Sequence, residues 1–190
     1  MVAGIFSWYV WLQTEDNEGV IWEKEDVDGY VVEGRKITNP KYGLAMMAPE
    51  GWIIKNYDDQ INIFSPNTEF NENGEYMMSK MREQGGCGIA LKIEKYKKIQ
   101  GLDTHADYLR ILIEEAKTGK FNTEEIKEEV INIAGHESLK TTYFKKGEEI
   151  SIEIKTPIGN IVYDFTTGVI YSNHCIDYFQ DAINTVQISG

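Results

Sequence analysis

Ile150-Ser-Ile-Glu-Ile-Lys155 places isoleucine at every second position, with a polar side chain after each one. Successive side chains of a β-strand point to opposite faces, so this stretch predicts a strand with one face buried and the other in water. Two flanking segments, Ser138–Phe144 and Ile161–Phe165, are separated from it by glycine-containing turns. Residues 137–167 therefore predict an antiparallel meander of three strands.

The chain before this meander contains further short strand patterns and one long loop. Residues 66–86 hold Pro66 and several glycines without sustained periodicity, so they predict a loop, with a helical turn at Tyr76–Arg82. The predicted strands lie around Val20–Trp22, Tyr30–Val32, Tyr42–Ala48, Trp52–Lys55, Gln60–Ser65 and Ile89–Ile93.

Two helices complete the predicted fold. Residues 103–117 repeat apolar side chains at intervals of three and four after a capping Asp103 or Thr104, and Gly119 ends the pattern. A closing helix is expected to begin near Ser172 or Asn173 and to run to about residue 186. Strands, helix, meander and helix in this order predict an α+β fold class, an antiparallel sheet covered by helices.

Length and charge restrict the classes of protein that fit. The chain has 190 residues and a net charge of −12, which suits one acidic globular domain, and its field repels a phosphate backbone. The most basic stretch, 92–98, alternates lysine with other residues and is typical of the solvated face of a strand. We therefore expect no nucleic acid partner.

The first residues differ in character from the rest. Residues 1–12 carry no charge and contain Trp8, Tyr9 and Trp11, and an acidic stretch begins soon afterwards. They are too short to span a bilayer and lack the basic start of a signal peptide. Two interpretations remain open: the end of a membrane tether, whose aromatic residues would lie at the interface, or an apolar element of the core.

The segment 42–52, Tyr-Gly-Leu-Ala-Met-Met-Ala-Pro-Glu-Gly-Trp, resembles the opening strand and turn of the PsbP-like and Mog1-like proteins. Ala106-Asp107-Tyr108 and 133–143 extend the resemblance, which covers roughly residues 41–189. It implies a PsbP-like α/β sandwich domain at 41–190, with a central antiparallel sheet sandwiched by helices. The apolar segment and acidic extension at 1–40 lie outside the resemblance. It also implies a non-catalytic accessory role, because the family has no shared catalytic set.

The residues that could carry chemistry form no recognisable set. The histidines have no metal-ligand spacing, the paired glutamates are typical of a solvated face, and 25–29 only partly resembles a calcium loop. Cys87 and Cys175 could pair or stay free. We predict no catalytic, cofactor-binding or metal-binding residues and no cofactor. The residues considered are His105, His136, His174, Glu124, Glu125, Glu128, Glu129, Cys87 and the turn of Pro49, Gly51 and Trp52.

These observations favour a non-enzymatic protein-binding or adaptor domain, extracytoplasmic and membrane-tethered, which uses a sheet edge or the 66–86 loop to hold an unidentified protein partner. The alternatives are a small hydrolase or isomerase with a cleft that the sequence does not reveal, and a cytoplasmic interaction module whose apolar N-terminal segment is part of the core.

Overall fold

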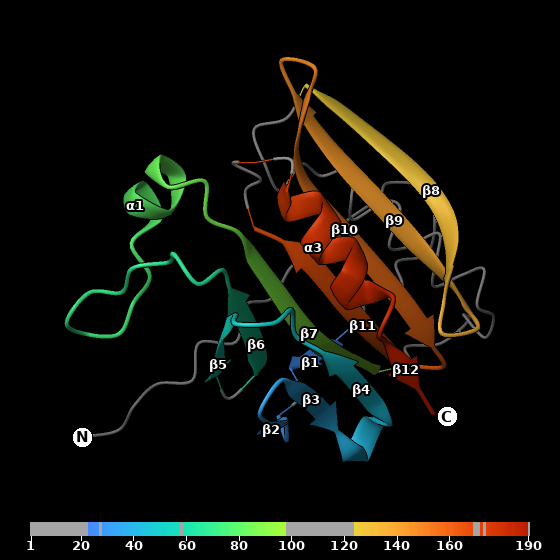
Figure 1. Ribbon diagram of the computed structural model, residues 1–190. Helices are drawn as coiled ribbons and strands as arrows, with labels where there is room; N and C mark the ends of the chain where they lie inside the picture. The colour runs from blue at the N-terminus through green and yellow to red at the C-terminus, as the bar shows by residue number, and fades with distance from the viewer. Residues whose placement is uncertain are drawn as a thin grey trace.

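The computed structural model describes residues 23–26, 28–57, 59–97, 124–168, 172 and 174–189, with the side chains of 23–26 and 96–97 left aside. Its main element is an antiparallel sheet of eight strands (Figure 1). Seven of them lie in the order β5-β6-β7-β11-β10-β9-β8, and β1 pairs with the far half of β7. The strands are β1 (Glu23–Asp26), β5 (Ile53–Tyr57), β6 (Gln60–Phe64), β7 (Gly88–Lys97), β8 (Glu125–Ile133), β9 (His136–Lys145), β10 (Glu148–Ile158) and β11 (Ile161–Thr167).

A second, smaller antiparallel sheet has the order β12-β4-β3-β2. It is formed by β2 (Val31–Glu33), β3 (Lys36–Asn39), β4 (Leu44–Met47) and β12 (Gln187–Ile188). The 3-10 helix η1 (Pro40–Tyr42) joins β3 to β4 and ends at Gly43, which has φ of 64°. A Cβ at Gly43 would lie 1.9 Å from the Ser189 carbonyl oxygen, so only glycine lets the C-terminal strand pair here. The small sheet joins β2 and β3, which lie before the domain boundary predicted at residues 40 and 41, to β4, which lies after it.

The hydrophobic core lies between one face of the large sheet, the small sheet and α3 (His174–Ile183), which crosses the sheet in Figure 1. α3 buries Cys175, Phe179, Ala182 and Ile183. Ile61, Leu91, Phe165 and Ile154 come from neighbouring strands of the large sheet, and Ile37, Leu44 and Met46 come from the small one. Trp52 follows the turn at Gly51, belongs to the core and packs against Tyr178, with ring centroids 5.1 Å apart.

The predicted fold class is wrong. The described residues are mainly strand, in two antiparallel sheets, and contain two α-helices, α1 (Met78–Glu83) and α3. This is not an α+β sandwich with flanking helices, and it also conflicts with a PsbP-like α/β description. Sequence periodicity underestimated the strands, because β3, β8 and β12 lack a long apolar alternation. The helix predicted at 103–117 and the strand at 20–22 lie outside the described residues.

The predicted meander is present, but one detail of it is wrong. β9, β10 and β11 pair in order, with Ile154 opposite both Lys140 and Phe165. The face expected to be wet is buried, since Ser151, Glu153 and Lys155 expose 0%, 3% and 5% of their surface. Alternating isoleucine and polar residues fit this outcome equally well, because charged side chains can be buried when they pair with one another.

A disulfide between Cys87 and Cys175 resolves the alternative that the sequence left open. It joins the residue before β7 to the first turn of α3, with a Cα–Cα distance of 5.3 Å. Both cysteines are buried, and Ser65 fixes the first of them by accepting the Cys87 N–H at 2.9 Å through its hydroxyl oxygen. The bond therefore fastens α3 to the start of β7.

Candidate functional site

The 66–86 segment, predicted as a long loop, is ordered by its own polar contacts. The Asn71 side-chain oxygen accepts the N–H groups of Asn73 and Glu75 at 3.0 and 2.9 Å, which closes a tight turn. Phe70 and Tyr76 form a β-bridge on either side of that turn. The segment is therefore a small hairpin that leads into α1, two residues later than the helical turn expected at Tyr76–Arg82.

α1 is held against the start of β7 by close packing around Met81. The Gly86 N–H donates to the Met81 carbonyl at 2.7 Å, and a Cβ at Gly86 would lie 2.7 Å from the Met81 side chain. A Cβ at Gly88 would lie 3.2 Å from the Met81 methyl carbon. The glycines flanking Cys87 therefore let the helix approach the strand, where a larger residue would push it away.

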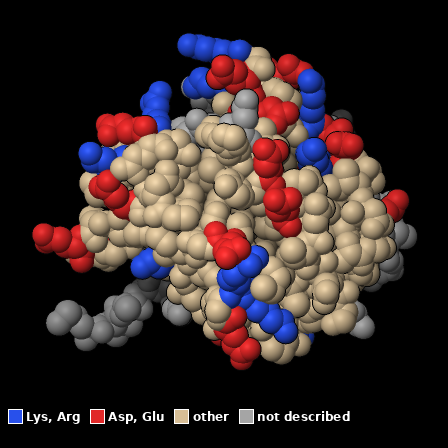
Figure 2. All heavy atoms as spheres, in the orientation of Figure 1, with Lys and Arg blue, Asp and Glu red and all other residues tan. Residues whose placement is uncertain are grey.

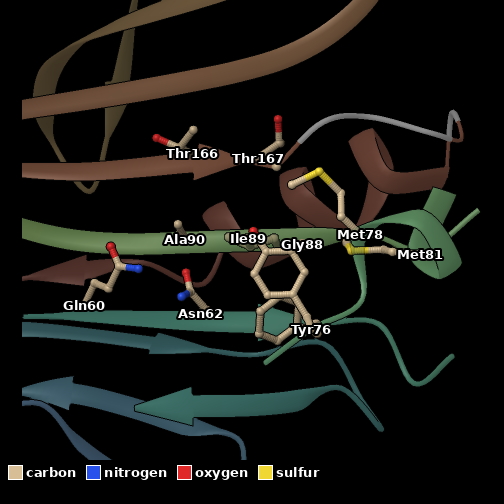
Figure 3. Close-up of a pocket in the computed structure, with 12 residues that line it drawn as sticks. Gln60, Asn62, Tyr76, Met78, Met81, Gly88, Ile89, Ala90, Thr166 and Thr167 are labelled. Atoms are coloured by element: carbon tan, nitrogen blue, oxygen red, sulfur yellow. The ribbon is translucent and has the colours of Figure 1, made fainter. Parts of the chain in front are cut away.

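A hollow of about 290 Å³ lies beneath this helix, on the face of the large sheet opposite α3 (Figure 3). Its base is β7, where Gly88 and Ala90 are too small to fill the space between β6 and β11. Asn62 pairs with Ala90 on one side and Thr166 pairs with it on the other. The full lining is Gln60, Asn62, Phe64, Tyr76, Met78, Met81, Gly88, Ile89, Ala90, Thr166, Thr167 and Gly168.

The mouth of the hollow carries exposed apolar groups. Tyr76 and Met78 expose 40% and 54% of their surface, and both belong to the described large hydrophobic residues that reach solvent. The Tyr76 ring is supported by Phe64, with centroids 5.1 Å apart. A ring and a thioether that stay exposed beside a hollow are typical of a contact surface.

Two side-chain amides in the hollow have no hydrogen-bond partner within the described part of the chain. Gln60 and Asn62 are half-buried and stand two residues apart on β6, so they point to the same side (Figure 3). Thr166 differs, because its hydroxyl donates to Asp164 Oδ1 at 2.8 Å and only its lone pairs are left to accept. The site thus offers amide donors, amide acceptors and one hydroxyl acceptor.

A buried ionic network continues from Thr166 along the same face of the sheet. Lys155 Nζ lies 3.8 Å from Asp164 Oδ2 and 3.6 Å from Glu153 Oε1. Tyr143 donates its hydroxyl to Glu153 Oε2 at 2.9 Å. Burial raises the pKa of Tyr143 above its usual range, and the negative charge of Glu153 raises it further. Tyr143 is therefore held as a neutral donor, and none of these ionisable residues lines the hollow.

Stability is expected to fall at alkaline pH because of the buried tyrosines. Burial is the main cause that raises the pKa values of Tyr30 and Tyr143 above the ordinary 10.0. Above pH 10 the unfolded chain releases these protons while the folded chain keeps them, so the free energy of unfolding decreases with rising pH, by at most about 1.4 kcal/mol per pH unit for each such tyrosine. Urea unfolding at pH 8 to 11 measures this decline in the free energy of unfolding. Tyr143→Phe should flatten the decline, and an unchanged slope would contradict the assignment.

The residues considered from the sequence alone do not converge on this site. His136 begins β9 and His174 begins α3. Glu124 lies beside β8, at the other edge of the sheet, where it accepts the Lys146 N–H. Glu125, Glu128 and Glu129 are exposed along β8, whereas His105 lies outside the described residues. Among the described residues, no group of three histidine, cysteine, aspartate or glutamate side chains is placed to hold a metal ion. Of the described residues in this set, only Cys87 is adjacent in sequence to a residue that lines the hollow, which is Gly88.

The site residues that sequence reasoning missed are the neutral ones on β6, β7 and β11. A signal for them exists in Gln60-Ile-Asn-Ile-Phe64, because the strand period places Gln60 and Asn62 together opposite the buried isoleucines. The interpretation of the basic stretch at 92–98 as the solvated face of a strand also needs correction. Glu94 on β7 is buried, and Lys92 lies 3.5 Å from Asp59, so this part of the strand is not a solvated face.

Charged side chains of both signs are interspersed on the face that carries α3, and some of the acidic ones lie near the middle of the view (Figure 2). A broad area between them carries neither sign in this view. Within the described residues, no helix has the length and apolar character needed to cross a membrane.

Comparisons with known proteins add little. No family model and no curated protein matches the chain. A crystal structure of a protein from Bacteroides thetaiotaomicron is similar at 12% sequence identity with a TM-score of 0.46. The match covers 78% of this chain and 46% of that one, so this chain spans less than half of its length. None of these comparisons tests the resemblance to the PsbP-like and Mog1-like proteins, which stays a prediction, whereas the sandwich architecture it implied is wrong.

Proposed function

We propose that this protein is a non-enzymatic binding domain that holds a protein partner at the hollow beneath α1. The observation that carries the proposal is the chemistry of the lining: amides, hydroxyls, thioethers and rings, with Tyr76 and Met78 exposed at the mouth. Such a surface recognises by shape and hydrogen bonding. It also agrees with the role suggested by the 66–86 segment, which presents both exposed residues.

An extracytoplasmic location is the second part of the proposal. It is supported by the disulfide between Cys87 and Cys175, because disulfides persist in oxidising compartments and are rare where glutathione and thioredoxin keep thiols reduced. A tether through residues 1–12 belongs to the same proposal, on the aromatic and uncharged character of that segment. The acidic net charge continues to argue against nucleic acid as a partner.

A hydrolase or isomerase is the second candidate. The buried network of Tyr143, Glu153, Lys155 and Asp164 favours it, since buried ionisable groups in contact are a feature of active sites. These groups pair with one another, and none of them lines the hollow. The hydroxyls of Thr166 and Thr167, which do line it, have no neighbouring base among the lining residues. Binding is therefore the function that the geometry supports better.

Site-specific photo-cross-linking in cells of the source organism tests this function. Tyr76→p-benzoylphenylalanine is expected to yield one discrete cross-linked protein, because position 76 stands at the mouth of the hollow. Val31→p-benzoylphenylalanine is the matched control, since Val31 is exposed to a similar degree, 43% against 40%, but lies on β2 of the small sheet. Equal products from both positions, or none from position 76, would count against the proposal.

A further inference from the structure

The hollow can be assigned to a chemical class of ligand, and this assignment rests on the function proposed above. We propose that it takes an extended, uncharged polypeptide segment of the partner, with one apolar or aromatic side chain inserted between Tyr76, Met78 and the floor of β7. The lining, the spacing of the two free amides and the volume each support this choice.

The absence of charge in the lining determines the charge of the ligand. Among the described residues that line the hollow, none is an acid, a lysine, an arginine or a histidine. The nearest lysine in the register, Lys92 opposite Gln60, already lies 3.5 Å from Asp59. A charged group entering the hollow would lose water without gaining a counter-ion, which is costly, so neutral groups are selected.

The spacing of Gln60 and Asn62 indicates an extended backbone. They stand two residues apart on one strand, so their side chains repeat at about 6.6 Å, the distance between residues i and i+2 of any extended chain. Each carboxamide offers both a donor and an acceptor, and has no partner in the described structure. An extended segment lying along β6 would present one main-chain amide to each of them, and Thr166 could accept a third N–H.

The size of the hollow is that of one large side chain with its neighbouring peptide groups. Its volume of about 290 Å³ lies at the lower end of the range of small-molecule pockets. In Figure 3, Met78 and Met81 lie at the α1 end of the hollow, and Gln60 and Asn62 lie at the other end. Phe64 belongs to the α1 end, because it and Met81 are both within 4 Å of where a Cβ of Gly88 would lie. This separation places the side chain under α1 and the backbone along β6, and methionines adapt to side chains of differing shape.

Titration of the isotopically labelled full chain, followed by NMR, tests the assignment. The probe is the pentapeptide acetyl-Gly-Gly-Phe-Gly-Gly-amide, compared with the same peptide carrying central lysine or aspartate and with triacetylchitotriose, a neutral sugar that also bears amides. We expect the phenylalanine peptide to shift the side-chain amide signals of Gln60 and Asn62 and the backbone signals of Ala90 and Thr166. The charged peptides should bind at least tenfold more weakly.

Substitutions at the site and away from it complete the test. Ala90→Leu fills the base of the hollow and should weaken the phenylalanine peptide at least tenfold, whereas Ala45→Leu, the same change on β4, should leave its affinity unchanged. Preference for the sugar, equal binding of charged peptides, or undiminished binding by Ala90→Leu would overturn the assignment. If position 76 still cross-links a partner while no peptide binds, the ligand class is wrong and the proposed function stands.

Discussion

Replacing Cys87 and Cys175 together by serine is expected to lower the melting temperature by roughly 5 to 20 °C. The disulfide closes a loop with a sequence separation of 88 residues. A cross-link over a loop of this length stabilises by up to about 4.6 kcal/mol through the reduced entropy of the unfolded chain, and typical losses are about 2–5 kcal/mol. In a domain of this size, each kcal/mol corresponds to about 2–4 °C.

Thermal melts with and without a reductant separate the cross-link from the substituted side chains. The reductant should lower the melting temperature of the parent chain and leave the double variant unchanged, because only the parent has a bond to lose. Parent and variant melting together under oxidising conditions would contradict the role given to this disulfide. So would a parent chain that is insensitive to a reductant strong enough to reduce the buried bond in urea.

Lys155→Met is expected to destabilise the fold by about 3–5 kcal/mol, because it removes the ammonium that lies within 4 Å of both Glu153 and Asp164 in a buried environment. Methionine is unbranched and only one atom shorter than lysine, so the loss of charge is the main change. The matched control is Lys140→Met on the adjacent β9, whose ion pair with Glu129 is much more accessible, with side chains 29% and 65% exposed, and it should cost less than about 1 kcal/mol.

Urea unfolding of the two variants measures the difference. A loss in Lys155→Met as small as that in Lys140→Met would mean that the buried network adds nothing to stability. A second variant guards against gross misfolding: Thr166→Val removes only the hydroxyl that donates to Asp164, and should cost about 1–2 kcal/mol while the chain stays folded.

The elements that sequence predicted well are those with local, periodic signals. The alternation around Ile150–Lys155 identified β10 and its neighbours, and the apolar stripe after residue 173 identified α3. β8 was missed because Glu125–Ile133 places charged residues in succession, a pattern that marks exposed strands and solvated helices alike. The pairing of β12 with β4 joins residues far apart in the chain, so no local pattern could reveal it.

The candidate site was the least predictable part, for two physical reasons. Its chemistry is neutral, and amides such as Gln60 and Asn62 belong to no catalytic or metal-binding motif. Its shape depends on the small side chains of β7. Gly88 and Ala90 leave a hollow only because the neighbouring strands place larger residues, such as Asn62 and Thr166, beside them. The pairing of Cys87 with Cys175 likewise needed the three-dimensional positions of β7 and α3.

The claim that the hollow binds a protein partner is tested most directly by the yield of the position-76 cross-link when the hollow is filled. Ala90→Leu combined with the photo-reactive residue at position 76 should reduce the cross-linked product at least tenfold, while Ala45→Leu in the same background should leave it unchanged. Mass spectrometry of the product from the parent background should locate the attachment in an extended, uncharged segment of the partner. An undiminished yield in Ala90→Leu would contradict the account.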